Sequence, residues 1–583
     1  MAGLFLISTR DPDFAASALG EARTQFALHG FSDLTETGFP GWTLLHAPHI
    51  LGGPESLLVD GDDLVAVAGT LVFDGQMGRP ALEALRRAAL LPAPDWSRLS
   101  GQFVALVRSG GRTLLLTDFF GAFQIFHDAG RRIFSTSLLA AAKALPKVRF
   151  NTQALYEFAF NVVPIGDDSI FEELTLLGPD RMVELTAAGS QLHPLAKPLP
   201  AAPVAQPIGE RIERHRAHLS AIARDHVAQF GNRVHCPLSG GLDSRLLLAA
   251  LRAEGCTPHI YVYGWPDDTD VRIAKEIAAI EGFALECVDK DEAEITPDAF
   301  PAQVERNFHQ YDALPNYGEL FENGGNAAAR DARHAGGALS ASGGCGEIYS
   351  NFFFLPDRPV SAATVARTFF ARFTQNDVTG AFDEAAFLRG IETKILAALD
   401  LPPGSARRPI PRAMVEQIYP RVRCRSLFGR EISLEARHGA YLMPFLDQQV
   451  VGEAMTLPMG LKHAGVFEAK LLAAIDPVLA AYPSAYGHDF AGPPSRRHRF
   501  SEWSSRIRPA WVRQKSYAIQ RRLRPMADEH GGIFSDDYLG RVIDLDYPAM
   551  RRFFRMESIT DSSVWRRIAC LEYLAGHLGS RLG

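Results

Sequence analysis

The sequence is poor in the features that mark secreted, membrane-spanning and nucleic-acid-binding proteins. Its 583 residues contain six cysteines without paired short spacing, which argues against a disulfide framework or a zinc site. No apolar run reaches membrane-spanning length, and Arg10, Asp11 and Asp13 soon follow the short apolar start, unlike a signal peptide. A formal net charge of -7 argues against general nucleic-acid binding. These absences favour a cytoplasmic protein with no transmembrane segment and no nucleic-acid partner.

The composition that remains is that of an ordinary globular protein. With 47% hydrophobic and 22% charged residues, the chain is long enough for two or three domains with buried cores. Prolines at 194, 198, 200, 203 and 207 interrupt an alanine-rich stretch, and proline removes hydrogen-bond donors that helices and central strands need. We therefore predict an N-terminal domain over residues 1–195, a proline-rich linker over 196–208 and a second domain over 209–583.

A glycine-rich turn carries the clearest chemical signal. It joins a predicted apolar strand over residues 234–238 to an apolar helix and comprises Leu238, Ser239, Gly240, Gly241, Leu242, Asp243 and Ser244. Two glycines let backbone N–H groups converge with the positive end of the helix on a phosphate, and the serines add hydroxyl donors. A carboxylate beside phosphates costs free energy unless a divalent cation lies between them, so Asp243 implies Mg²⁺. The simpler alternative is a glycine turn whose polar residues only cap the helix.

This turn resembles the pyrophosphate loop of the N-type ATP pyrophosphatases, which cleave ATP between the α and β phosphates. Further stretches resemble the asparagine synthetase B-like family within that group. Tyr263, at the end of Tyr261-Val262-Tyr263-Gly264, matches the residue that lies against adenine in that family. The resemblance implies that ATP and Mg²⁺ are the cofactors and that a carboxylate is adenylated.

A second stretch, residues 339–349, is similar to the family's other phosphate-side loop, written Ser-Gly-x-Gly-x-Asp-Glu-x-Phe. The similarity implies that Ser342 and Gly343 contact the nucleotide and that Glu347 joins Asp243 as a magnesium ligand. This loop is one residue shorter and keeps one acid where the family offers two. Glu347 could instead be an ordinary loop carboxylate.

Two downstream segments extend the resemblance. Glu435-Ala436-Arg437 and Pro444-Phe445-Leu446-Asp447 match a continuous family segment, but about three extra residues intervene, which suggests an insertion near the acceptor site. Lys470 lies in a segment similar to Lys-x-Leu-Leu, whose lysine stabilises charge in the amide-forming step. Asp447 could also be a loop carboxylate, and Lys470 could lie on the solvated face of a helix.

The N-terminal third resembles the glutamine amidotransferase domain of the same family. Apolar stretches over 99–106 and 114–121, joined by Gly110-Gly111, predict a β-hairpin. In that domain an N-terminal cysteine attacks glutamine, but this sequence begins Met1-Ala2-Gly3 and its first cysteine is Cys236. Because alanine supplies no thiolate, we expect a degenerate glutaminase domain, with nitrogen supplied by an amine that binds directly.

The implied fold class is an α+β N-terminal Ntn-hydrolase-like sandwich (αββα). It is followed by an α/β adenine nucleotide alpha hydrolase-like (PP-loop) synthetase domain with a parallel sheet and additional C-terminal helices. The implied activity is an ATP-dependent ligase that adenylates a carboxylate, releases pyrophosphate and forms an amide. Without the cysteine, the closest kinds of relative are lasso-peptide cyclases and β-lactam synthetase.

A lasso-type macrolactam cyclase is the most specific hypothesis, with a precursor peptide and a processing protease as possible partners. A β-lactam-type small-molecule cyclase, an ammonia-dependent asparagine synthetase and a non-catalytic nucleotide-binding scaffold stay open. The base that accepts the amine proton is also open among Tyr317, Glu319 and Tyr349. Between Ser495 and Pro525, ten arginines and lysines oppose one acid, Glu502, which fits either a solvated helix face or a docking surface.

Overall fold

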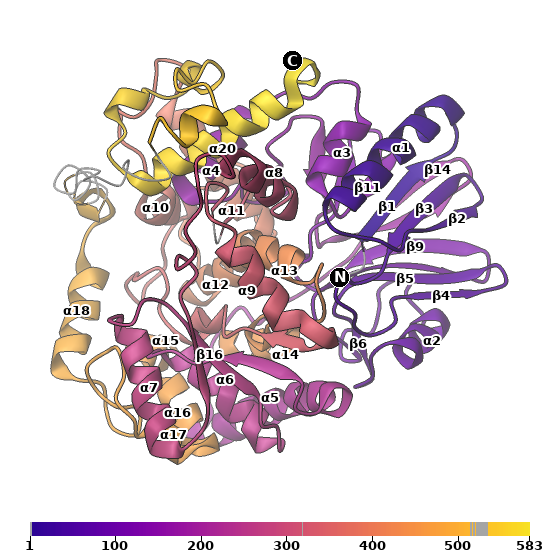
Figure 1. Ribbon diagram of the computed structural model, residues 1–583. Helices are drawn as coiled ribbons and strands as arrows, with labels where there is room; N and C mark the ends of the chain where they lie inside the picture. The colour runs from indigo at the N-terminus through magenta and orange to yellow at the C-terminus, as the bar shows by residue number, and fades with distance from the viewer. Residues whose placement is uncertain (1–2, 317–318, 514–515, 517–518, 520–534) are drawn as a thin grey trace.

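The computed structural model describes residues 3–316, 319–513, 516, 519 and 535–583. A β-sandwich built from the N-terminal third lies beside a larger part that contains a parallel sheet and most of the helices (Figure 1). Among the described residues, no helix combines the length and the apolar character needed to cross a bilayer.

The sandwich consists of two antiparallel sheets. The first has the strand order β12-β10-β11-β1-β3-β2, with β1 (Gly3–Ser8), β2 (Thr35–Phe39), β3 (Trp42–Ala47), β10 (Phe126–Asp128), β11 (Ile133–Ser135) and β12 (Leu174–Leu176). The second has the order β14-β13-β9-β8-β5-β4, with β4 (Leu57–Asp60), β5 (Asp63–Gly69), β8 (Phe103–Ser109), β9 (Arg112–Thr117), β13 (Arg181–Thr186) and β14 (Gly189–Pro194). A short pair, β6 (Val72–Phe73) and β7 (Leu99–Ser100), lies beside them.

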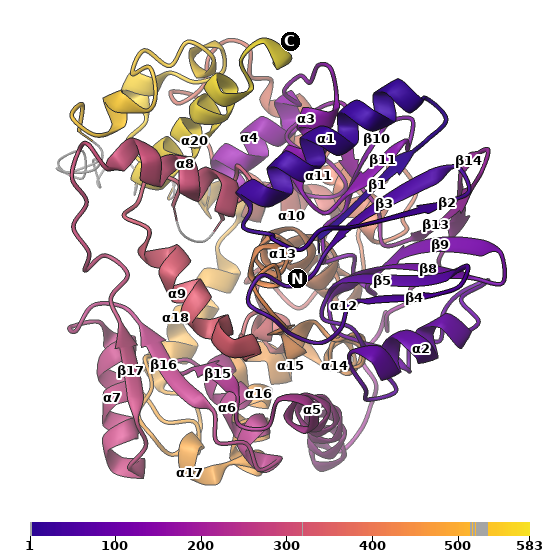
Figure 2. The same ribbon diagram turned by 45° about the vertical axis from the view of Figure 1, so that its right-hand side comes forward.

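Helices cover both outer faces of the sandwich. Helices α1 (Pro12–Leu28) and α3 (Leu138–Ala144) pack on the first sheet, and α2 (Arg79–Arg87) packs on the second (Figure 2). Apolar side chains of both sheets fill the space between them, because alternate residues of a strand point to the same face. The expected αββα layering is therefore confirmed. The predicted hairpin is also confirmed: β8 and β9 pair through a turn in which Gly110 and Gly111 adopt positive φ angles of 58° and 80°.

The second part is built on a five-stranded parallel sheet of order β17-β16-β15-β18-β19. Its strands are β15 (Val234–Pro237), β16 (His259–Tyr263), β17 (Leu285–Val288), β18 (Leu339–Ala341) and β19 (Tyr441–Leu442). This confirms the predicted parallel sheet. The chain order runs outward in both directions from the β15–β18 pair, and ligands of open α/β sheets bind outside the carboxyl ends of strands at such a reversal. The sheet topology therefore predicts a ligand site at the loops after β15 and β18.

Helices make up most of the rest of this second part. They are α5 (Ile208–Phe230), α6 (Leu242–Ala253), α7 (Thr269–Glu281), α8 (Phe300–Gln310), α9 (Gly325–His334), α10 (Ala362–Val365), α11 (Glu384–Ala398), α12 (Arg412–Glu416), α13 (Gly429–Glu435), α14 (Gln448–Met455), α15 (Met459–Lys462), α16 (Val466–Ile475), α17 (Pro477–Ala480), α18 (Arg496–Ile507) and α20 (Ser562–Leu578). The C-terminal α20 packs on α4 (Thr152–Asn161), so the predicted additional C-terminal helices are present. The residues between Pro194 and Ile208 form neither helix nor strand, and the domain boundaries themselves stay a prediction.

Candidate active site

The glycine-rich turn lies at the carboxyl end of β15 and opens α6, as the sequence predicts. The Ser239 and Ser244 hydroxyl oxygens are 2.8 Å apart, which ties the start of the turn to the first turn of the helix. The Gly241 N–H donates to Ser239 Oγ at 3.2 Å, and the Gly240 N–H donates to Asp270 Oδ1 at 2.9 Å. Both N–H groups therefore have acceptors inside the protein, and a phosphate bound to the turn would take the place of these acceptors.

Close packing makes glycine necessary at the tip of this turn. A Cβ on Gly240 would lie 2.9 Å from Ala485 Cβ, Asp270 Oδ1 and Ile273 Cδ1. The Ala485 N–H donates to the Gly240 carbonyl at 3.0 Å, and the buried Arg245 guanidinium donates to the Tyr482 carbonyl at 3.0 Å. The segment that contains Tyr482 and Ala485 therefore holds the turn in place.

The loop after β18 packs directly on the first turn of α6. A Cβ on Gly343 would lie 2.9 Å from the Ser244 nitrogen, and a Cβ on Gly346 would lie 2.3 Å from Asp243 Cγ. Because both positions are glycine, this loop lies closer to Asp243 than it could with any larger residue at either position. The structure brings the two predicted loops together, with Ser342 and Gly343 beside the glycine-rich turn.

Asp243 and Glu347 line one cavity of about 320 Å³, here named the carboxylate cavity. Glu468 of α16 lines it as well, and sequence reasoning assigned that residue no role. Further lining residues include Leu242, Lys462, Tyr486, His498, Ser501, Glu502 and Ser505. Tyr419 donates its hydroxyl hydrogen to Glu347 Oε2. The predicted magnesium ligands therefore share one site.

The acids of this cavity repel one another in a poorly solvated place. Burial, followed by the charge of Glu347, raises the pKa of Asp243 to about 7. Burial, followed by the charge of Asp243, raises the pKa of Glu468 well above its ordinary value. Glu468 Oε1 is buried and has no hydrogen-bond partner. Several converging carboxylate oxygens with an unsatisfied lone pair are a donor set that fits Mg²⁺.

We expect the stability that Asp243 contributes to the magnesium-free protein to fall as pH rises. In the folded chain Asp243 titrates at about pH 7, whereas an unfolded Asp titrates at about pH 3.9. The folded state therefore holds the Asp243 proton between these two pH values, so the contribution of this group to the free energy of unfolding falls across that window. Thermal unfolding in EDTA from pH 4.5 to 7.5 measures the slope. Asp243→Asn should have the more positive slope of stability against pH, because it lacks this group's negative contribution, and equal slopes would contradict the account.

A second cavity, of about 330 Å³, opens at the carboxyl ends of the parallel strands and is here named the strand-end cavity. Its lining includes Pro237, Tyr263, Lys290, Arg330, Arg333, Ser342, Glu431, Glu435 and Tyr441. Lys290 Nζ lies 3.7 Å from the centroid of the Tyr263 ring. Arg330 Nε donates to Glu435 Oε1 at 2.7 Å. Tyr263, predicted to lie against adenine, is thus in a cavity adjacent to the glycine-rich turn.

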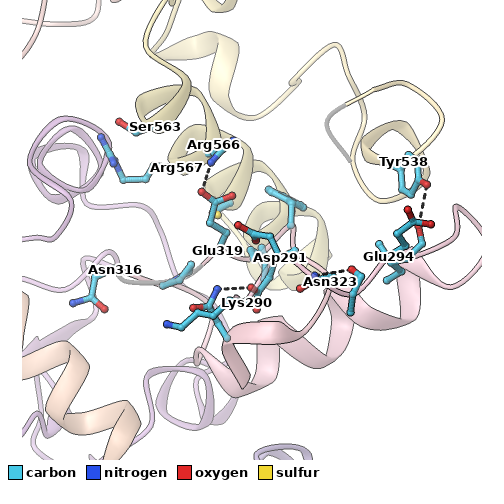
Figure 3. Close-up of a pocket in the computed structure, with 18 of the residues that line it drawn as sticks. Lys290, Asp291, Glu294, Asn316, Glu319, Asn323, Tyr538, Ser563, Arg566 and Arg567 are labelled. Atoms are coloured by element: carbon cyan, nitrogen blue, oxygen red, sulfur yellow. Dashed lines mark hydrogen bonds and ion pairs between the residues drawn. The ribbon is translucent and has the colours of Figure 1, made fainter. Parts of the chain in front are cut away.

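A third and larger cavity, of about 910 Å³, is here named the outer cavity (Figure 3). It shares Lys290, Asn316 and Asn326 with the strand-end cavity. Acids and bases both line it, and Figure 3 shows the ion pair between Arg566 and Glu319. A nucleotide-sized cavity therefore adjoins a space that is suited to a larger polar molecule.

The structure does not bring every predicted residue to this site. Lys470 is exposed on α16, whereas Glu468, two residues earlier and on another face of the helix, lines the carboxylate cavity. Asp447 caps α14 and accepts a hydrogen bond from Ser100 Oγ of the sandwich at 2.8 Å. Asp447 therefore makes a contact between the two parts of the chain, and any role of this residue near an acceptor site stays a prediction.

The candidates for the general base are also separated. Tyr349 is buried, with its hydroxyl 3.3 Å from His215 Nδ1, and Glu319 faces the outer cavity. Tyr317 lies outside the described residues. In the basic stretch, α18 contributes His498 and Ser501 to the carboxylate cavity, while Lys515, Arg521, Arg522 and Arg524 lie outside the described residues.

Comparisons with known proteins give a distant structural likeness. No family model and no curated protein matches the sequence, whereas 24 solved chains match in structure. One is the glutamine phosphoribosylpyrophosphate amidotransferase of B. subtilis complexed with ADP and GMP. Its sequence is 11% identical, the match covers 49% of this chain and 90% of that chain, and the TM-score is 0.23. Another is the allosteric regulatory enzyme of purine biosynthesis. Its sequence is 8% identical, the match covers 50% of this chain and 80% of that chain, and the TM-score is 0.22. At these scores the likeness decides nothing about the site.

Proposed function

We propose that this chain is an ATP-dependent carbon–nitrogen ligase of the asparagine synthetase B-like, PP-loop type. It adenylates a carboxylate, releases pyrophosphate and joins the activated acyl group to an amine. The observation that carries the proposal is the meeting of two glycine-containing loops at the reversal of a parallel sheet, with Asp243 and Glu347 in one cavity. A loop that only capped α6 would not need a second loop packed against Asp243.

The phosphates and the nucleoside of ATP are proposed to bind at two different sites. The phosphates would bind to the glycine-rich turn at the N-terminus of α6, where they would replace Asp270 on the Gly240 N–H and Ser239 Oγ on the Gly241 N–H. The strand-end cavity, where Tyr263 presents a ring, would take the nucleoside. When bound on Asp243 and Glu347, Mg²⁺ would neutralise phosphate charge.

The nitrogen donor is proposed to be an amine that binds directly. Residues 1–235, which include the whole sandwich, contain no cysteine, so this domain offers no thiolate for glutamine hydrolysis. The sandwich instead supplies contacts to the second part of the chain, such as the bond between Ser100 and Asp447.

The outer cavity favours a peptide as the substrate. Its volume of about 910 Å³ is large for a single small amino acid and lies near the upper end of typical ligand sites. Its boundary with the strand-end cavity contains Lys290, whose ammonium could orient a substrate carboxylate toward the α phosphorus. These features support a macrolactam cyclase of the lasso-peptide kind over a small-molecule cyclase.

The chemistry follows in two steps. The substrate carboxylate attacks the α phosphorus of ATP, and the turn's N–H groups stabilise the charge that develops on the departing pyrophosphate. The neutral amine then attacks the acyl carbonyl, AMP leaves, and an amide forms. Glu319 in the outer cavity could accept the amine proton, and the exposed Lys470 would have to move to reach either step.

The test is incubation of the full chain with ATP, Mg²⁺ and peptides that carry a free amino terminus and an Asp or Glu side chain several residues later. We expect AMP and pyrophosphate, and a product lighter than the peptide by one water in its mass spectrum. ADP and phosphate would contradict the proposal. Nucleotide binding without turnover across a broad set of acids and amines would favour a non-catalytic scaffold.

A further inference from the structure

Glu468 is a buried acid whose carboxylate is only partly hydrogen-bonded. It lies in the first turn of α16, is 3% exposed and lines the carboxylate cavity. Its side chain shares a hydrogen bond with Asp243, but its Oε1 has no hydrogen-bond partner. A bound ion is one explanation of a buried polar atom left without a partner.

Of the cations next to this cavity, Lys462 has close partners and Arg506 faces Glu502 without a hydrogen bond from its Nη1. Lys462 Nζ lies 3.2 Å from Glu416 Oε2 and donates to the Ile348 carbonyl at 2.7 Å. Arg506 Nη1 lies 4.0 Å from Glu502 Oε1. The carboxylates of Asp243, Glu347 and Glu468 therefore share a cavity whose neighbouring positive charges are directed elsewhere.

The surrounding packing holds these acids close together. The absence of a side chain on Gly346 leaves the space that the Asp243 carboxylate fills, and Tyr419 anchors Glu347 Oε2. Helices α6 and α16 pack against each other, which places Glu468 beside Asp243. The first turn of α6, the loop after β18 and α16 thus present oxygen ligands from different directions, as a hard divalent cation requires.

We propose that Glu468 is a third carboxylate ligand of the divalent-cation site, acting with Asp243 and Glu347. The loop after β18 carries one acid, and α16 supplies the additional oxygen ligands from outside that loop. This inference rests on the proposed function, because the cations are those that accompany ATP.

The test is titration of the full chain with Mn²⁺, followed by its electron paramagnetic resonance signal, with and without a non-hydrolysable ATP analogue. We expect Glu468→Gln to weaken Mn²⁺ binding at least tenfold. The matched control is Glu276→Gln, the same change at an exposed position of α7, which should leave the affinity unchanged. Wild-type Mn²⁺ affinity in Glu468→Gln would overturn the inference.

Two further variants separate the possible failures. If Asp243→Asn also binds Mn²⁺ like the unmodified chain, the cation site of the proposed function fails; if only Glu468→Gln does so, the third ligand alone fails. Should Glu468→Gln not fold, Glu468→Asp keeps the charge but shortens its reach, and unchanged affinity there would contradict the inference. If Glu468 were purely structural, Glu468→Gln would have a lower melting temperature than the unmodified chain when both are free of metal. If Glu468 is a ligand, the metal-free variant should melt at the same temperature as the unmodified chain or at a higher one.

Discussion

Asp243→Asn is expected to reduce AMP formation by about 10²–10³-fold, because electrostatic groups aimed at developing charge contribute about that factor. Asparagine fills the same volume but loses the negative charge that would hold Mg²⁺ against the pyrophosphate. Release of AMP and pyrophosphate from ATP, in the presence of the peptide substrate, measures the effect. Binding of an ATP analogue with Mg²⁺ gives a second readout that needs no substrate.

The control for this prediction is Asp298→Asn, the same chemical change at a side chain that is 92% exposed and paired with Arg541. Its activity and analogue binding should match those of the unmodified chain. Near-normal AMP formation by Asp243→Asn, with the control also active, would remove the carboxylate cavity from the mechanism.

Asp312→Ala is expected to lower the free energy of unfolding by about 3–5 kcal/mol, the typical cost of breaking a buried ion pair. Asp312 is fully buried and accepts a hydrogen bond from Arg437 Nη2 at 2.9 Å. It also accepts the N–H groups of Leu138 and Leu139 at 2.7 and 2.9 Å, at the start of α3 in the sandwich. The substitution would leave Arg437 buried without its partner. Guanidinium denaturation of the full chain measures the loss.

The pH dependence of this contribution has a defined sign. Burial raises the pKa of Asp312, but the charges of Arg437, His29 and Arg430 and the backbone N–H group of Leu139 together outweigh burial and hold the pKa below its usual range. The stabilisation is therefore present above the ordinary Asp pKa and is lost as pH falls below it. At pH 7, a loss under about 1 kcal/mol would show that this buried cluster does not join the two parts of the chain.

Local patterns explain why much of the site could be predicted from sequence. Gly240 and Gly241 lie at a strand-to-helix junction whose geometry depends on adjacent residues, so the turn, β15 and α6 lie where the pattern places them. The position of Glu347 near this turn could also be predicted, because its loop comes after β18, which pairs with β15 in the sheet. The hairpin of β8 and β9 also depends on adjacent residues, at Gly110 and Gly111.

Long-range packing explains what could not be predicted. Side chains two residues apart on a helix point in directions that differ by more than half a turn. The rotation of α16 about its axis therefore decides that Glu468, and not Lys470, faces the other carboxylates. Asp447 binds Ser100, a residue 347 positions away, which no local pattern contains. Lys290 reaches Tyr263 because β17 lies next to β16 in the sheet.

The most direct test of the central claim is a crystal structure of the full chain with a non-hydrolysable ATP analogue and Mg²⁺. The account predicts the phosphates on the N–H groups of Gly240 and Gly241, Mg²⁺ on Asp243 and Glu347, and the adenine beside Tyr263. A nucleotide bound elsewhere, with the turn still closed on Asp270 and Ala485, would contradict it.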